Sequence, residues 1–145
     1  MVAAIMMSIS ETSRRNGMET TKAYTDIEQS KKLAEILPLE SADMYWWYSG
    51  KRYYIEAIDD GDFNENSDIR AWSLAALLDV LPNNENISTN LSKGGYRIST
   101  LEYTNSWFVD YEDEINGLNN CVASAGNPVD ACVEMIMRLK EKGLL

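Results

Sequence analysis

The chain has 145 residues, of which 45% are hydrophobic and 25% charged, a balance that is typical of a globular protein with its own core. With 23 acidic residues against 13 basic ones the formal net charge is −10, so we expect no direct binding to nucleic acid, which requires clustered lysine and arginine. The sequence contains no histidine, the commonest general base and the commonest metal ligand, and we expect no metal site and no cofactor.

Cysteine usage and hydropathy indicate a cytoplasmic protein. Cys121 and Cys132 are too few for a disulfide framework, and the apolar neighbours of Cys132 favour a buried thiol over a bridge. No stretch is long and apolar enough to span a bilayer, so we expect no membrane association. Residues 1–24 are expected to form a disordered N-terminal extension, and residues 25–145 a single domain.

A first helix is expected to begin after Thr25 and to end near residue 37. Thr25 and Glu28 have the spacing of a capping box, in which each side chain bonds to the backbone of the other residue. Apolar residues recur at helical spacing over residues 27–37. Pro38 ends the helix, because proline disfavours helical geometry at the residue before it.

A β-hairpin is predicted next. Residues 44–48 and 52–58 are rich in aromatic and β-branched side chains and flank a turn that contains glycine. Because side chains alternate along a strand, one face carries Met44, Trp46, Tyr48, Tyr53, Ile55 and Ala57, and the other carries Tyr45, Trp47, Arg52, Tyr54 and Glu56. The first face is expected to pack on the core, since the second holds two charged residues.

Residues 59–68 are expected to form an acidic loop, and its carboxylates suggest a calcium-binding site. An EF-hand loop that began at Asp60 would need glycine at position 65 and glutamate at position 71. The sequence has Glu65 and Ala71 at these positions. A solvated acidic turn is therefore favoured over a calcium site.

The middle of the chain predicts a second helix and a second hairpin. Apolar spacing indicates a helix over residues 69–81, followed by a long connection over residues 83–95. Residues 96–103 are expected to pair with residues 106–112 across a short turn. Residues 113–126 are expected to form a loop.

The last helix has the strongest local signals. Asn127 can accept a hydrogen bond as N-cap, Pro128 suits the first helical position, and Asp130 places negative charge in the first turn. Gly143 is a suitable left-handed terminator. The helix is therefore expected to span most of residues 128–142.

Together these elements predict an α+β fold in the order α-β-β-α-β-β-α. The two hairpins are expected to form one antiparallel sheet of about four strands. Three helices are expected to pack mainly on one face of that sheet.

Aromatic residues on the first hairpin are the best candidates for a binding site. Tyr45, Trp47 and Tyr54 would lie opposite the core face, where they would either contact a partner or be covered by a helix or a second protomer. Asp110 and Glu112 share a strand face predicted to be exposed, and they form a weaker, polar candidate. No catalytic residue is assigned.

Three segments carry a resemblance to a known group of proteins. They are Ser41-Ala42-Asp43-Met44 after a Leu-Pro pair, residues 71–78 and residues 127–135. The sequence resembles small proteins encoded by phages and integrated elements of gut bacteria, over roughly residues 25–145. The resemblance implies a mobile-element origin and a cytoplasmic setting, and it implies no activity, cofactor or catalytic residue.

These observations favour a non-enzymatic binding or accessory protein that acts through protein–protein contacts with an unidentified partner, with a homodimer as an open possibility. One alternative is an acidic mimic of DNA that inhibits a host nucleic-acid-binding protein, which would need carboxylates spaced like phosphates. A further alternative is an enzyme that uses carboxylates without histidine, which would need a pocket with a buried carboxylate.

Overall fold

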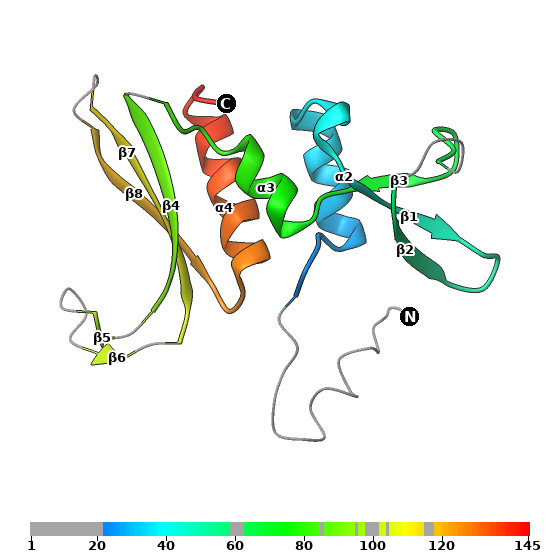
Figure 1. Ribbon diagram of the computed structural model, residues 1–145, viewed down its shortest axis with the longest axis horizontal. Coiled ribbons are helices and arrows are strands. Elements are labelled where there is room, and N and C mark those ends of the chain that lie inside the picture. Colours follow the sequence, from blue (N-terminus) through cyan, green and yellow to red (C-terminus); the bar gives the residue numbers. More distant parts are fainter. Residues whose placement is uncertain are drawn as a thin grey trace. The chain divides into compact units, whose positions relative to one another are not determined.

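The computed structural model describes residues 22–58, 63–84, 86–94, 96–97, 102–103, 105–114 and 118–145 (Figure 1). Within these ranges the chain is α+β, with three α-helices, two three-stranded antiparallel sheets and one two-stranded pair. The predicted α+β class is confirmed. The expected single sheet of about four strands is wrong, because the two halves of the chain build separate sheets.

The chain divides into two compact units, Met1–Ala76 and Leu77–Leu145, and the boundary falls inside helix α3 (Leu74–Val80). The expectation of one domain over residues 25–145 stays a prediction. The expected disordered extension lies mostly outside the described residues, but its last three residues are ordered. Tyr24 forms an isolated β-bridge with Ser73 and packs edge-on against the Trp46 ring, so the structured part extends further toward the N-terminus than expected.

Helix α2 (Ile27–Ile36) begins with a capping box one residue later than predicted. Asp26 is the N-cap, and its carboxylate accepts from the Gln29 backbone N–H at 2.8 Å, while the Gln29 side chain accepts from the Asp26 N–H at 3.1 Å. Leu37 is the C-cap before Pro38, as expected, and Leu33 is fully buried. A short 3₁₀ helix, η1 (Leu39–Ser41), follows.

The first sheet has the strand order β2-β1-β3. Strands β1 (Met44–Tyr48) and β2 (Tyr53–Ala57) form the predicted hairpin, and Gly50 adopts a φ of +98° in its turn, a region that glycine tolerates best. Strand β3 (Ile69–Ala71) pairs with the other edge of β1.

The second predicted helix therefore begins too early. Residues 69–71 are a strand, because β1 offers them a hydrogen-bonding edge and their side chains alternate between its faces. Helix α3 begins only after Ser73, whose hydroxyl accepts from the Ala76 backbone N–H at 3.2 Å and donates to Asp43. This N-cap fixes the point where strand changes to helix.

The second sheet has the order β4-β7-β8 and differs most from the prediction. Strand β7 (Trp107–Asp113) pairs with β4 (Ile87–Lys93) and β8 (Leu118–Ala125), two segments that were expected to be a connection and a loop. In the expected partner of β7, residues 96–103, the described residues instead form a short pair of their own, β5 (Tyr96–Arg97) with β6 (Glu102–Tyr103). Strands β4 and β8 contain many polar residues, so their sequences carry a weak strand signal. Pairing with β7 makes these segments strands.

Helix α4 (Pro128–Glu141) matches the prediction closely. Asn127 is the N-cap and accepts from the Asp130 backbone N–H at 2.9 Å, and Gly143 adopts a φ of +73° just past the helix end. The helix packs against β7 and β8 of its own unit (Figure 1). Its fully buried residues supply much of the core of this unit; they are Pro128, Val129, Ala131, Cys132, Met135, Ile136 and Leu139. None of the helices that the structure describes is both long enough and apolar enough to cross a membrane.

Candidate functional site

The first hairpin packs one face on the core, as predicted, but only along part of its length. Trp46 is 5% exposed, and its indole N–H donates to the backbone oxygen of Thr25 at 3.0 Å. Tyr48 and Ala57 were expected on this core face, yet Tyr48 is 55% exposed and Ala57 is exposed as well. The reason is that α2 packs chiefly against β3 and does not cover the whole hairpin.

Tyr45 is not a surface residue, so its prediction as a partner contact is wrong. Only 3% of it is exposed, and its hydroxyl donates to a Glu56 carboxylate oxygen at 3.1 Å. The Phe63 ring meets the Tyr45 ring edge-on at 5.5 Å, and the Arg70 guanidinium lies 4.5 Å from the centre of the Phe63 ring. A segment that follows the hairpin therefore covers this end of the sheet face.

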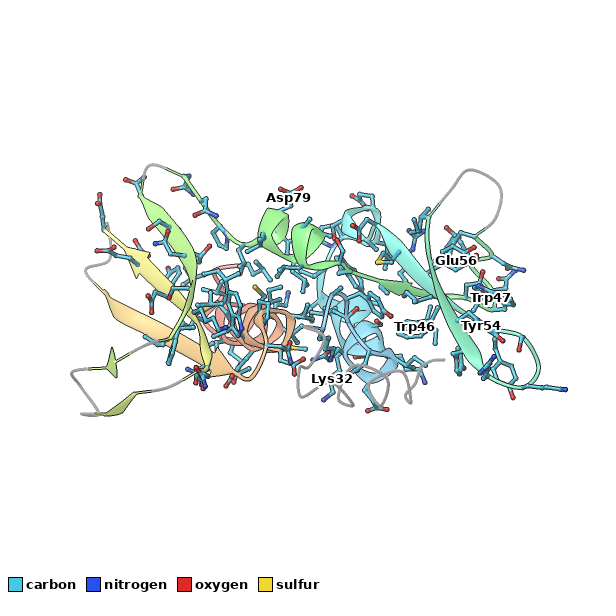
Figure 2. The ribbon with its side chains drawn as sticks, turned by 60° about the horizontal axis from the view of Figure 1, so that its bottom comes forward. Lys32, Trp46, Trp47, Tyr54, Glu56 and Asp79 are labelled. Carbon is cyan, nitrogen blue, oxygen red and sulfur yellow. The ribbon has the colours of Figure 1, made fainter. Side chains whose placement is uncertain are left out.

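Trp47 and Tyr54 lie together further along the same face, as predicted. Their rings stack with centroids 5.0 Å apart at 26°, and both residues are half-buried. The Arg52 guanidinium lies 5.0 Å from the centre of the Tyr54 ring, and its Nε donates to the Tyr54 hydroxyl at 2.8 Å. Figure 2 shows Trp47, Tyr54 and Glu56 on one side of the hairpin and Trp46 on the other.

Two further aromatic residues lie at the same end of the hairpin, on the opposite face. The rings of Tyr48 and Tyr53 have centroids 5.0 Å apart and are tilted by 50°. Sequence reasoning placed both on the core face and missed them as candidates. We call Trp47, Tyr48, Arg52, Tyr53 and Tyr54 the aromatic tip.

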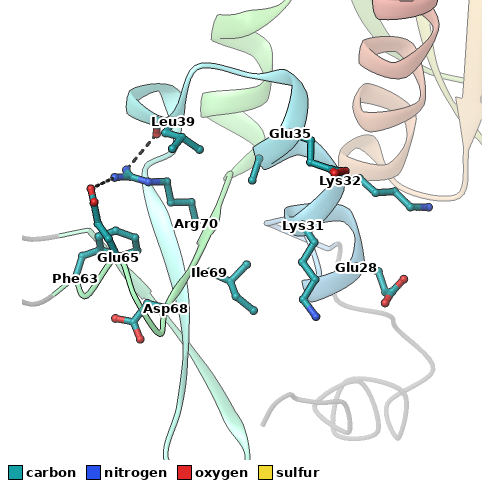
Figure 3. A pocket seen from close by; sticks show the side chains of 11 residues that line it. Glu28, Lys31, Lys32, Glu35, Leu39, Phe63, Glu65, Asp68, Ile69 and Arg70 are labelled. Atoms are coloured by element: carbon teal, nitrogen blue, oxygen red, sulfur yellow. Dashed lines mark hydrogen bonds and ion pairs between the residues drawn. The ribbon is translucent and has the colours of Figure 1, made fainter.

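A separate open groove lies between α2 and the segment that leads into β3, with a volume of about 510 Å³ (Figure 3). Lys31 and Lys32 line it from α2, and Asp68 and Arg70 line it from the opposite wall. Arg70 is already held there, because it donates to the backbone oxygen of Leu39 at 3.2 Å and to a Glu65 carboxylate at 3.1 Å. Charges of both signs occur on the walls, so the groove selects no ligand of one charge.

Asp110 and Glu112 lie on the outward face of β7, in the C-terminal unit, as predicted. Glu112 is exposed and Asp110 is half-buried, and their cross-strand partners on β4 are Ser88 and Asn90. Asp113 lies on the opposite face, is 2% exposed and accepts from the Tyr111 hydroxyl at 3.2 Å. The carboxylates of the outward face therefore have polar, solvent-accessible surroundings within their own unit.

Reactive groups are scarce in the described part of the chain. Among these residues no group of three or more Cys, Asp or Glu side chains is arranged to hold a metal ion. Cys132 is a free thiol that is fully buried, and burial raises its pKa to about 11. A thiol with that pKa is almost entirely protonated at neutral pH and is a poor nucleophile.

Comparisons with protein-family models, with curated proteins and with solved structures find no match to this chain.

Proposed function

We propose that the chain is a non-enzymatic accessory protein that binds another protein through the aromatic tip, in the phage or mobile-element setting that the sequence resemblance implies. One observation carries the proposal: four aromatic side chains and an arginine gather at one end of a hairpin, where Tyr48 is 55% exposed. Tyrosine, tryptophan and arginine are the residues most enriched among those that dominate binding energy at protein interfaces.

The order of the aromatic tip also supports a binding role. Trp47 stacks on Tyr54, and Arg52 is held against the same ring by a hydrogen bond. Side chains that are already fixed lose little conformational entropy when a partner arrives, whereas each mobile side chain costs about 0.5–1.5 kcal/mol to immobilise. Gly50, in the turn, holds the two strands in a tight hairpin that presents these rings.

Site-specific photo-crosslinking tests this proposal. A photoreactive residue in place of Tyr48 should crosslink to one defined protein in lysate of the host cell, whereas the same residue in place of Asp79, exposed on α3, should not (Figure 2). The double variant Trp47→Ala, Tyr54→Ala should stay folded and lose this crosslink. Equal crosslinking from both positions, or an unchanged crosslink in the double variant, would contradict the proposal.

Neither alternative from the sequence gains comparable support. Around the groove, Lys31 and Lys32 alternate with Glu28 and Glu35 along α2, which does not resemble a row of phosphates. The most buried carboxylate among the described residues, Asp113, accepts a hydrogen bond from a tyrosine and does not line the groove. Binding through the aromatic tip therefore remains the proposal that the described residues favour.

A further inference from the structure

Strand β2 is an edge strand, since the order of its sheet is β2-β1-β3. The Ser49 N–H donates to the Arg52 oxygen at 3.0 Å, and the Ile58 N–H donates to the Asp43 oxygen at 3.0 Å. In an antiparallel ladder such bonded pairs alternate along the strand. The backbone groups of Tyr53 and Ile55 therefore point away from β1, to an edge that is paired with no other described strand.

The side chains of β2 make this edge complementary to itself. Arg52, Tyr54 and Glu56 share one face. The positive charge therefore lies two residues before the tyrosine, and the negative charge lies two residues after it. Neither charge is neutralised by an ion pair within the described residues, because Arg52 contacts the Tyr54 ring and Glu56 accepts from the Tyr45 hydroxyl. A second β2 strand, run antiparallel and centred on Tyr54, would place each Arg52 opposite a Glu56.

The backbone allows the register centred on Tyr54, and the side chains favour it over its neighbours. Edge pairing forms hydrogen bonds only where outward-pointing residues face each other, and the register centred on Tyr54 sets Tyr53 against Ile55 twice. A register centred on Ile55 sets Tyr54 against Glu56 and leaves Arg52 opposite Ile58. A register centred on Glu56 sets two glutamates against each other. All three registers set outward-pointing residues against each other, so the charges decide, and only the first places Arg52 opposite Glu56.

We propose that two copies of this chain associate through their β2 edges in the register centred on Tyr54. The two three-stranded sheets then form one continuous antiparallel sheet of six strands, with the two aromatic tips adjacent. This proposal concerns the strand edge and a second copy, so it can fail while the proposed protein partner stands. An edge of this length is smaller than a standard protein interface of about 1,600 Å², and we expect a weak, reversible dimer.

A charge-swap experiment tests the register. Sedimentation is measured up to about 1 mM chain and at about 0.15 M salt, where the Debye length of about 8 Å screens the repulsion between two acidic chains. Arg52→Glu and Glu56→Arg each place like charges opposite one another twice, and each should weaken the dimer at least tenfold. An equimolar mixture of the two variants should form a heterodimer, because every pair is then of opposite charge. Glu40→Arg, the same charge change at an exposed site outside β2, should leave the dimer unchanged.

A backbone variant tests the edge itself. Proline at Ile55 removes an outward N–H and leaves the ladder to β1 intact, so Ile55→Pro should stay folded by circular dichroism and weaken the dimer at least tenfold. A wild-type chain that is monomeric at the highest concentration would overturn the proposal, and so would a dimer that no β2 variant weakens. A dimer that Ile55→Pro weakens but that the variant mixture does not restore would overturn the register.

Discussion

Thr25 should be among the most sensitive positions in the N-terminal unit, because it is a fully buried polar residue that ties three elements together. Its hydroxyl is 2.8 Å from the Ser30 hydroxyl on α2 and accepts from the Trp72 backbone N–H at 3.0 Å. Its backbone oxygen accepts from the indole N–H of Trp46 on β1. Thr25→Val keeps the shape of the side chain and replaces only the hydroxyl with a methyl group.

The cost follows from the groups that lose their partner. The Trp72 N–H and the Ser30 hydroxyl would both stay buried, and an unsatisfied buried group costs about 1–3 kcal/mol. We expect Thr25→Val to lower the free energy of unfolding by about 2–6 kcal/mol. Thr25→Ser keeps the hydroxyl and loses one methyl group, so it should cost only about 1 kcal/mol. Adding Ser30→Ala to Thr25→Val should cost less than the sum of the single changes, since the unpaired hydroxyl is then gone.

Tryptophan fluorescence during urea unfolding measures these values. Of the four tryptophans, only Trp107 lies in the C-terminal unit, so a Trp107→Phe background reports on residues 1–76 alone. The midpoint and the slope of the transition give the free energy in each variant. If Thr25→Val proved no more damaging than Thr25→Ser, the hydroxyl would not hold these elements together and the reasoning would be refuted.

Two further predictions concern Cys132 and Gly50. Because burial raises the pKa of the Cys132 thiol from 9.0 to about 11, the folded state holds this proton more tightly than the unfolded chain. Its contribution to stability should be complete below about pH 9 and fall between about pH 9 and 11, and Cys132→Ala should lack this loss in urea titrations. In a Cys121→Ser background, a thiol reagent at about pH 8 should label Cys132 only after unfolding; rapid labelling of the folded chain would contradict its burial. Gly50→Ala meets no atom within 4 Å but must adopt a φ of +98°, so it should cost about 1–2 kcal/mol in thermal unfolding, whereas Gly126→Ala, at a glycine without positive φ, should cost little; equal effects would argue against backbone strain.

Local signals in the sequence predict the elements that local chemistry determines. Asn127 and Pro128 start α4 where expected, since a cap and a fixed φ act within one turn. The hairpin around Gly50 forms because its turn and its alternation agree. Strand β4 is not predicted because several of its residues, such as Asn90, are poor strand formers, and its pairing with β7 makes it a strand.

The candidate site shows the same division. Alternation alone places Trp47 and Tyr54 on one face, and the structure stacks them. Alternation also places Tyr45 there, but it cannot reveal that Phe63, eighteen positions later in the sequence, packs on that ring. The exposure of Tyr48 likewise depends on packing between other elements, because α2 packs chiefly against β3. Which side chains share a face is local information, whereas what covers them is not.

Strand β2 has an exposed edge without the usual protection against pairing, and its charges complement those of an antiparallel copy. Exposed edges are commonly protected by proline, by lysine or by a bulge, and β2 has none of these over Tyr53–Ala57. Its neighbouring charges, Arg52 and Glu56, instead complement each other across an antiparallel copy. A dimer of this kind would bring two aromatic tips together, so that a protein partner could contact both and bind more tightly than a single tip allows. Self-association and partner binding would then reinforce each other, although each depends on different atoms of the same hairpin.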